Sequence, residues 1–136
     1  MRLLKLLPLL LAVTSQGWAL QAIAANMSEG EVSRHCLNLA QINHVEILDK
    51  QHIAFEINNG DYYMNVLPKP CLSLHRDRAL MYKTSLSKLC DLDIITVLDS
   101  MGGGYEPVGS CGLGDFNKSS ENEVKRLRDQ LKESSD

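Results

Sequence analysis

The residues of this chain with the richest chemistry are its four cysteines, Cys36, Cys71, Cys90 and Cys111. A cysteine can attack a substrate, bind a metal ion or form a disulfide. In a short exported chain, an even number of cysteines indicates disulfides first. Three pairings are possible. We expect Cys71 to pair with Cys90, which closes a local loop, and Cys36 with Cys111, which ties the start of the domain to its last strand.

Two other uses of these cysteines are weaker. Cys71 with His75 and Cys90 with Asp93 suggest a metal site, but zinc sites usually have more closely spaced ligand pairs. As a nucleophile, Cys90 would need a reduced thiol and a nearby base, whereas Asp91 and Asp93 would raise its pKa. We therefore expect no metal site and no cofactor, and we interpret Cys90 as the anchor of the strand that follows it.

Four further residues are candidates for binding or proton transfer. The expected strand register aligns His44, Glu56 and Tyr63 on the polar face of a sheet, where a base, an acid and a phenol could move a proton. The simpler interpretation is a solvated cross-strand row with a weak His–Glu pair. Tyr105 lies in the glycine-rich stretch GGGYEPVGSCGLG and is a candidate contact residue. We assign no catalytic residue.

The clearest structural signal is the stretch HIAFEINNGDYYMNV. Asn59-Gly60 is a preferred pair for a two-residue type I′ turn, in which both residues have positive φ. Apolar residues alternate on both sides of it, as expected for the strands of a hairpin. The predicted register pairs Ile57 with Tyr62, Phe55 with Met64 and Ile53 with Val66.

The remaining elements follow from the alternation of apolar residues and from turn signals. An odd loop at Asp49-Lys50-Gln51 lets Val45 oppose Phe55 and Ile47 oppose Ile53. Further strands are expected near residues 80–85, 93–98 and 108–116, with one helical turn at 86–89 and a mobile loop at 101–107. Ser120 and Glu123 match a capping box, which predicts a helix over residues 120–133.

Together these elements predict a mainly β fold: a small antiparallel barrel or sandwich of five to six strands, with a C-terminal helix and disulfide staples. The expected organisation is a signal peptide at 1–24, an N-terminal segment at 25–41, the β domain at 42–116, and the C-terminal helix and tail at 117–136.

The first residues have the layout of a secretory signal peptide. Arg2 and Lys5 give a basic start, an apolar run follows over residues 6–13, and small residues cluster near Ala24. The apolar run is shorter than the ~20 residues that a membrane-spanning helix needs. We therefore expect cleavage near Ala24, export to the periplasm and no membrane span in the mature chain.

Charge argues against one class of partner. The chain has 14 Lys and Arg against 17 Asp and Glu, a net charge of −3. Removal of Arg2 and Lys5 with the leader leaves 12 basic residues against the same 17, so the net charge becomes −5. Binding to nucleic acid depends largely on neutralising phosphates with Lys and Arg, so we expect no nucleic-acid partner.

Short segments around the cysteines also resemble a known family. It comprises short exported proteins of Gram-negative bacteria, catalogued as a domain of unknown function, with four cysteines. The resemblance spans residues 36–116 and implies location and architecture, but no catalytic residue. It rests on Cys36 and Ile42; Ile47 with Asp49; Tyr62-Tyr63 and Leu67-Pro68; Cys71 and Leu74; Tyr82 with Thr84-Ser85; Leu89-Cys90 with Asp93-Ile94-Ile95; and Cys111-Gly112-Leu113-Gly114 before Phe116.

We therefore expect a non-enzymatic periplasmic protein that binds an unknown protein or envelope component. One alternative is a periplasmic inhibitor of a hydrolase such as lysozyme, because small β domains with two disulfides suit that role. A second alternative is a small enzyme that uses His44 and Glu56. Its activity would be lost on His44→Ala or Glu56→Ala while the fold is kept.

Export has a direct test. Protein recovered from the periplasm should begin at Ala25 or Asn26 in N-terminal sequencing. It should also show only tyrosine-type fluorescence, because Trp18, the single tryptophan of the chain, leaves with the leader. Recovery of the uncleaved chain in the membrane fraction would refute the signal-peptide interpretation.

Overall fold

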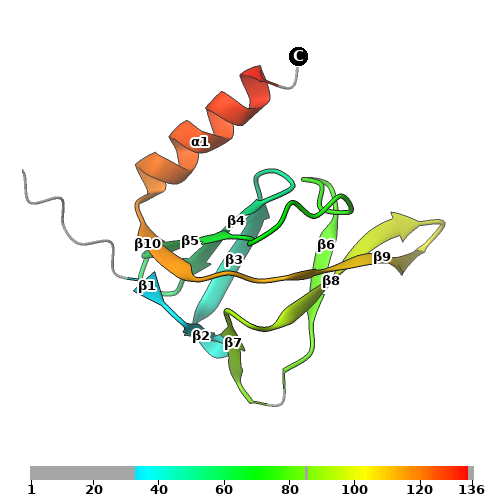
Figure 1. The fold of residues 1–136 in the computed structure, drawn as a ribbon, viewed down its shortest axis with the longest axis horizontal. Coiled ribbons are helices and arrows are strands. Elements are labelled where there is room, and N and C mark those ends of the chain that lie inside the picture. Colours follow the sequence, from blue (N-terminus) through cyan, green and yellow to red (C-terminus); the bar gives the residue numbers. More distant parts are fainter. Residues whose placement is uncertain (1–32, 85, 135–136) are drawn as a thin grey trace, which may run out of the picture.

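The computed structural model describes residues 33–84 and 86–134, which form antiparallel strands and one C-terminal helix (Figure 1). The mainly β fold is confirmed, with ten strands among the described residues instead of the five to six expected. The predicted signal peptide and residues 25–32 lie outside the described residues. The elements are β1 (Ser33–Arg34), β2 (Cys36–Asn38), η1 (Leu39–Gln41), β3 (Ile42–Ile47), β4 (His52–Ile57), β5 (Tyr62–Val66), β6 (Ala79–Tyr82), β7 (Lys88–Cys90), β8 (Ile94–Met101), β9 (Gly104–Gly112), β10 (Phe116–Ser119) and α1 (Glu121–Glu133).

The largest sheet has five strands in the order β1-β10-β5-β4-β3. Its β3–β4 turn is closed by Asp49, whose carboxylate accepts the backbone N–H groups of Gln51 and His52, both at 2.7 Å. This is the behaviour expected of an aspartate in a tight turn. The predicted register is confirmed for this pair of strands, with Val45 opposite Phe55 and Ile47 opposite Ile53.

The β4–β5 hairpin has a different turn from the predicted one. Among the described residues of this turn, only Gly60 has a positive φ, 84°, and the Ile57 N–H donates to the Asp61 carbonyl at 3.0 Å. The loop therefore contains three residues, in which a single left-handed glycine is sufficient. The extra residue shifts the register by one position. The predicted pairs Ile57–Tyr62, Phe55–Met64 and Ile53–Val66 are wrong, and the observed partners are Glu56–Tyr62, Phe55–Tyr63, Ala54–Met64 and Ile53–Asn65.

The second large sheet has three strands in the order β6-β8-β9. The β8–β9 hairpin projects from the body of the molecule (Figure 1) and turns at Gly102 and Gly103, which have φ values of 61° and 100°. The segment expected to be a mobile loop, residues 101–107, is therefore mostly strand. The helical turn expected at 86–89 is also wrong, because Lys88–Cys90 form β7, which pairs with β2.

The sheets pack around one hydrophobic core in a sandwich arrangement. At its centre the buried rings of Phe55 and Phe116 meet edge to face, with centroids 5.3 Å apart and planes at 76°. Burying one large apolar side chain contributes roughly 1.5–3 kcal/mol. The remaining core residues include Leu37, Ile47, Ile53, Ile57, Tyr63, Leu67, Leu74, Leu89, Ile95, Val97 and Leu113.

Helix α1 packs on the opposite face of the five-stranded sheet. It begins after Ser120, whose hydroxyl accepts the Glu123 N–H while the Glu123 carboxylate accepts the Ser120 N–H, so the predicted capping box is confirmed. Val124 is buried in a small cluster that includes Ala54 and Met64. Arg128 on the same helix donates two hydrogen bonds to Glu46 of β3, at 2.6 and 2.5 Å. The helix is therefore attached by both apolar and charged contacts.

Two disulfides join segments that are distant in sequence, and their pairing differs from the expected one. Cys36 bonds to Cys90 and Cys71 bonds to Cys111, so the predicted Cys71–Cys90 and Cys36–Cys111 pairs are wrong. The physical reason for the first pair is strand register, since Cys36 and Cys90 lie opposite each other in the β2–β7 ladder. The second bond joins the segment that follows β5 to β9.

The core can be tested by truncation. Phe55→Ala should lower the free energy of unfolding by about 3–5 kcal/mol, because the lost ring leaves a cavity against Phe116. Leu92→Ala is the control, since Leu92 is 89% exposed and its loss should change stability by less than about 0.5 kcal/mol. Denaturant unfolding measures both, and equal stability of the two variants would show that Phe55 is not in the core.

Candidate functional site

The predicted row of His44, Glu56 and Tyr63 is only partly formed. His44 and Glu56 lie opposite each other on β3 and β4, as expected. Tyr63 does not join them, because the one-residue shift of β5 turns its side chain into the core, where it is fully buried. Tyr62 instead lies opposite Glu56.

The side chains of this row pack on neighbouring strands, and Glu56 has a hydrogen-bond partner. Burial raises the pKa of Tyr62, and the neighbouring Glu56 carboxylate raises it further. Glu56 also accepts a hydrogen bond from Asn43 at 3.2 Å. The Arg34 guanidinium lies 5.1 Å from the centroid of the Tyr63 ring, and the Tyr63 hydroxyl has no hydrogen-bond partner among the described residues. The row is best explained as cross-strand packing, which weakens the interpretation as a small enzyme.

Tyr105 lies on β9 close to the tip of the projecting hairpin. Its side chain is 66% exposed, and Met101 across the turn is 62% exposed. The tip therefore presents two large side chains to solvent. Tyr105 remains a candidate contact residue, although it is held on a strand and not on a mobile loop.

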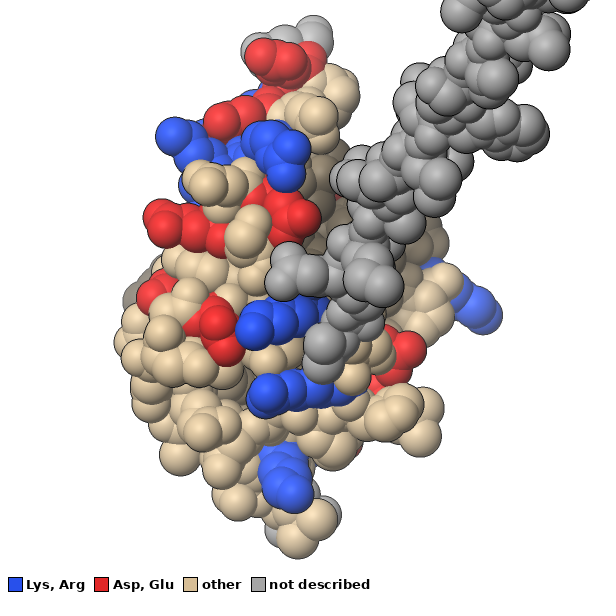
Figure 2. Space-filling model, turned by 90° about the vertical axis from the view of Figure 1, so that its left-hand side faces the viewer, with Lys and Arg blue, Asp and Glu red and all other residues tan. Residues whose placement is uncertain are grey.

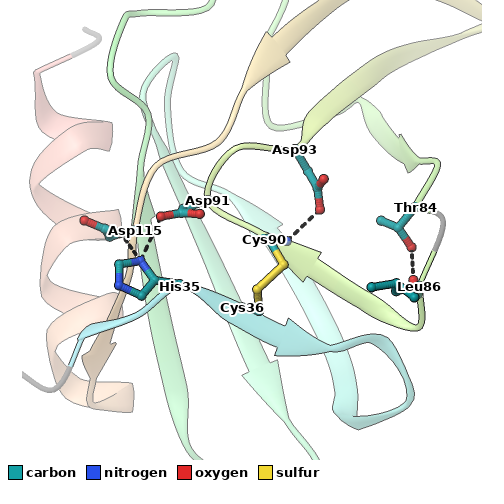
Figure 3. Close-up of a disulfide and its surroundings, with 8 residues drawn as sticks. All are labelled: His35, Cys36, Thr84, Leu86, Cys90, Asp91, Asp93 and Asp115. Atoms are coloured by element: carbon teal, nitrogen blue, oxygen red, sulfur yellow. Dashed lines mark hydrogen bonds and ion pairs between the residues drawn. A yellow bond between two sulfur atoms is a disulfide. The ribbon is translucent and has the colours of Figure 1, made fainter.

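A cluster that the sequence analysis missed lies beside the Cys36–Cys90 disulfide (Figure 3). His35 Nδ1 is 2.9 Å from Asp91 Oδ2 and 3.3 Å from Asp115 Oδ1. His35 directly precedes Cys36 and Asp91 directly follows Cys90, and the Asp91 N–H donates to the His35 carbonyl at 2.8 Å. The disulfide and this backbone hydrogen bond therefore hold the backbones of His35 and Asp91 side by side.

The simplest account of this cluster is an exposed ion pair. The hydrogen bond and charge of Asp91, together with the charge of Asp115, raise the pKa of His35, and the hydrogen bond from His35 lowers the pKa of Asp91. One nitrogen or oxygen atom from each of His35, Asp91 and Asp115 lies within 4.8 Å of the other two. Among the described residues, this group therefore has a set of donor atoms that a divalent cation could bind. The His35 side chain is 80% exposed, so an ion pair in water explains the cluster as well as a cation site does.

A groove lies beside the other disulfide, Cys71–Cys111. It encloses about 770 Å³ between residues 68–73, together with Arg78, and residues 108–112 of β9. We call it the β9 groove. Two apolar side chains of this groove face solvent, Leu72 at 77% exposure and Val108 at 39%. Ser73 packs so closely on Gly109 that a side chain at position 109 would collide with it.

Arg78 stabilises the wall of the β9 groove. Its guanidinium donates to the Ser73 carbonyl at 2.7 Å and forms an ion pair with Asp99 of β8 at 3.1 Å. The Cys71–Cys111 disulfide joins the same wall to β9. The groove is therefore preformed, because its two sides are linked by covalent and charged contacts.

The surface of α1 is a weaker candidate. In Figure 2, acidic and basic side chains are interspersed over the top of the molecule, where α1 lies. The first two turns already combine both signs, with Glu121, Glu123, Lys125 and Arg126. A mixed surface of this kind is typical of a solvated helix and does not select a ligand by charge.

Comparison of the chain with protein-family models finds no match, and searches of curated proteins and of solved structures find none either. The family resemblance therefore remains a prediction. Among the described residues, no helix combines the length and apolar character needed to cross a membrane.

The His35 cluster predicts a specific titration. Because the folded protein raises the pKa of His35 above 6.5, its contribution to stability is complete below that value and is lost as the pH rises through the folded pKa. The contribution of Asp91, whose pKa is lowered from 3.8, is lost as the pH falls through its folded pKa. NMR titration of the His35 ring should give a midpoint above 6.5 that falls in Asp91→Asn.

Asp129→Asn on α1 is the control for this titration and should leave the His35 midpoint unchanged. If Asp91→Asn also leaves the midpoint unchanged, the ion pair does not form in solution.

Proposed function

We propose that this chain is an exported, non-enzymatic binding module that recognises a partner protein or envelope component through the β9 groove. The observation that carries the proposal is a preformed groove of about 770 Å³ with exposed apolar walls beside the outermost strand of a sheet. Export is supported by the leader-like N-terminus and by two disulfides, which persist in oxidising compartments.

The composition of the groove favours binding. Leu72 and Val108 expose apolar area beside a concave surface, and burying apolar area is the main driving force of association. Pro68 and Pro70 restrict the backbone of one wall, and the disulfide at Cys71 holds that wall in place. A rigid groove loses little conformational entropy when it binds, which raises affinity.

A second candidate function is inhibition of a hydrolase such as lysozyme. The observation that favours it is the projecting β8–β9 hairpin (Figure 1), with Met101 and Tyr105 exposed near its tip. A narrow hairpin of this kind suits insertion into the cleft of an enzyme. This function would use the tip of the hairpin, whereas the first uses its base.

Site-specific photo-cross-linking tests the proposed function. A photoreactive amino acid in place of Leu72 should cross-link one envelope protein or component from a bacterial extract. The same substitution at Leu92, which is more exposed but lies outside the groove, should give no such product. Excess unlabelled protein should compete with the labelled protein and reduce this cross-link. Unlabelled Leu72→Asp should not compete, because it places a charge in the apolar wall, whereas unlabelled Leu92→Asp should still compete.

Equal cross-linking from positions 72 and 92 would show that the groove is not the binding surface. Inhibition of lysozyme that is relieved by Tyr105→Ala and unaffected by Leu72→Asp would instead favour the second candidate function.

A further inference from the structure

β9 is an edge strand of its sheet, and its residues 108–112 line the groove. We infer that the β9 groove takes an extended segment of a partner protein that carries a carboxylate and adds to β9 as a further strand. This inference rests on the proposed function and names the chemistry of its partner.

The first argument is the unpaired edge. Within the described part of the chain, β9 pairs with β8 on one side and with no strand on the other. Its outward N–H and C=O groups therefore form a template for another extended backbone. Addition of a peptide strand to such an edge is an established mode of recognition, in which backbone hydrogen bonds supply affinity and neighbouring pockets supply specificity.

The second argument is the length of edge that is available. Pro107 lacks an N–H, and the β8–β9 register is interrupted between Val97 and Leu98, opposite the Pro107–Gly109 stretch. Beyond β9, the Leu113 N–H is already bonded to the Asp93 carbonyl at 3.0 Å. These features leave residues 108–112, the same residues that line the groove. At ~3.3 Å per residue, this window accepts a segment of about five residues.

The third argument is charge complementarity. The residues that line the groove include Lys69 and Arg78 and no carboxylate, although the whole chain has a net charge of −3. Asp99 offsets the charge of Arg78, whereas Lys69 forms no ion pair with any described residue. The groove is therefore locally positive and apolar, which suits an extended segment with an Asp, a Glu or a free C-terminus beside apolar side chains.

The same charges argue against a second copy of this chain as the occupant. Glu106 is the single acidic residue of β9 and lies outside the 108–112 window. Pairing of two β9 strands would bring two Lys69 ammonium groups to one interface, and the residues that line the two grooves contribute no carboxylate to balance them. Like charges at an interface oppose association, so a partner with a carboxylate is favoured.

Selection from a library of random hexapeptides on beads, with the full chain as the target, tests the inference. Selected peptides should contain a carboxylate. Isothermal titration should show at least about tenfold weaker binding when that carboxylate becomes an amide, or when Lys69→Gln removes its partner. Lys125→Gln on α1 is the matched control and should bind as the unmodified chain does.

Backbone methylation of the selected peptide then tests strand addition. In an added strand, the N–H groups of alternate peptide residues point toward β9. N-methylation of those residues should weaken binding at least about tenfold, whereas N-methylation of the other residues should have little effect, because only one edge of the peptide pairs with β9. Equal effects of the two methylation patterns would overturn strand addition. The inference would also be overturned if the library yields no peptide whose binding is lost in the Leu72→Asp variant.

The outcomes separate this inference from the proposed function. Cross-linking from position 72 together with methylation-insensitive peptides would leave the groove as the binding surface but exclude strand addition. A dimer of the chain, seen by sedimentation and dissociated by Leu72→Asp, would assign the groove to a second copy and contradict the inference.

Discussion

The Cys71–Cys111 disulfide is the constraint on which the proposed site depends. The segment that contains Cys71 leaves the five-stranded sheet after β5, and Cys111 belongs to β9 of the other sheet. The Cys71 N–H also donates to the Lys50 carbonyl at 2.7 Å, so the segment is fixed to the β3–β4 turn as well. A cross-link across 40 positions of sequence restricts the unfolded chain and holds both walls of the β9 groove in the folded one. The groove therefore depends on long-range topology, because contacts between segments that are distant in sequence hold its two walls together.

The parts of the fold that follow local rules could be predicted from the sequence. The β3–β4 register follows from the parity of the Asp49–Gln51 loop, and the start of α1 follows from the Ser120–Glu123 capping box. The β4–β5 hairpin shows the limit of such rules. Asn59-Gly60 is compatible with a two-residue and with a three-residue turn, and the choice moves every side chain of β5 to the other face. Packing decides it, since Met64 contacts the helix-side cluster and Tyr63 fills the core. For this reason the sequence predicts the positions of His44 and Glu56 correctly and that of Tyr63 incorrectly.

The candidate site was harder to predict, because it depends on which cysteines pair. A Cys71–Cys90 bond would close the shorter loop, but strand pairing places Cys36 opposite Cys90 in the β2–β7 ladder. Once that pair is known, His35 and Asp91 must be neighbours, and Cys71 must reach Cys111 on β9. Lys69 and Leu72 then become walls of a groove, although nothing in their local sequence distinguishes them from ordinary loop residues. Long-range topology, more than residue type, determines the site.

In the account that we propose, the helix-covered sheet provides stability and the edge of the second sheet provides the recognition surface. The central claim is that a partner segment adds to β9 between residues 108 and 112. Amide hydrogen exchange of the full chain, measured by NMR with and without a bound groove-selected peptide, tests it most directly. Our account predicts slower exchange at alternate residues of this window, where N–H groups face the groove, and little change on β3 or at the hairpin tip. Slower exchange confined to Met101 and Tyr105, with the window unchanged, would contradict it.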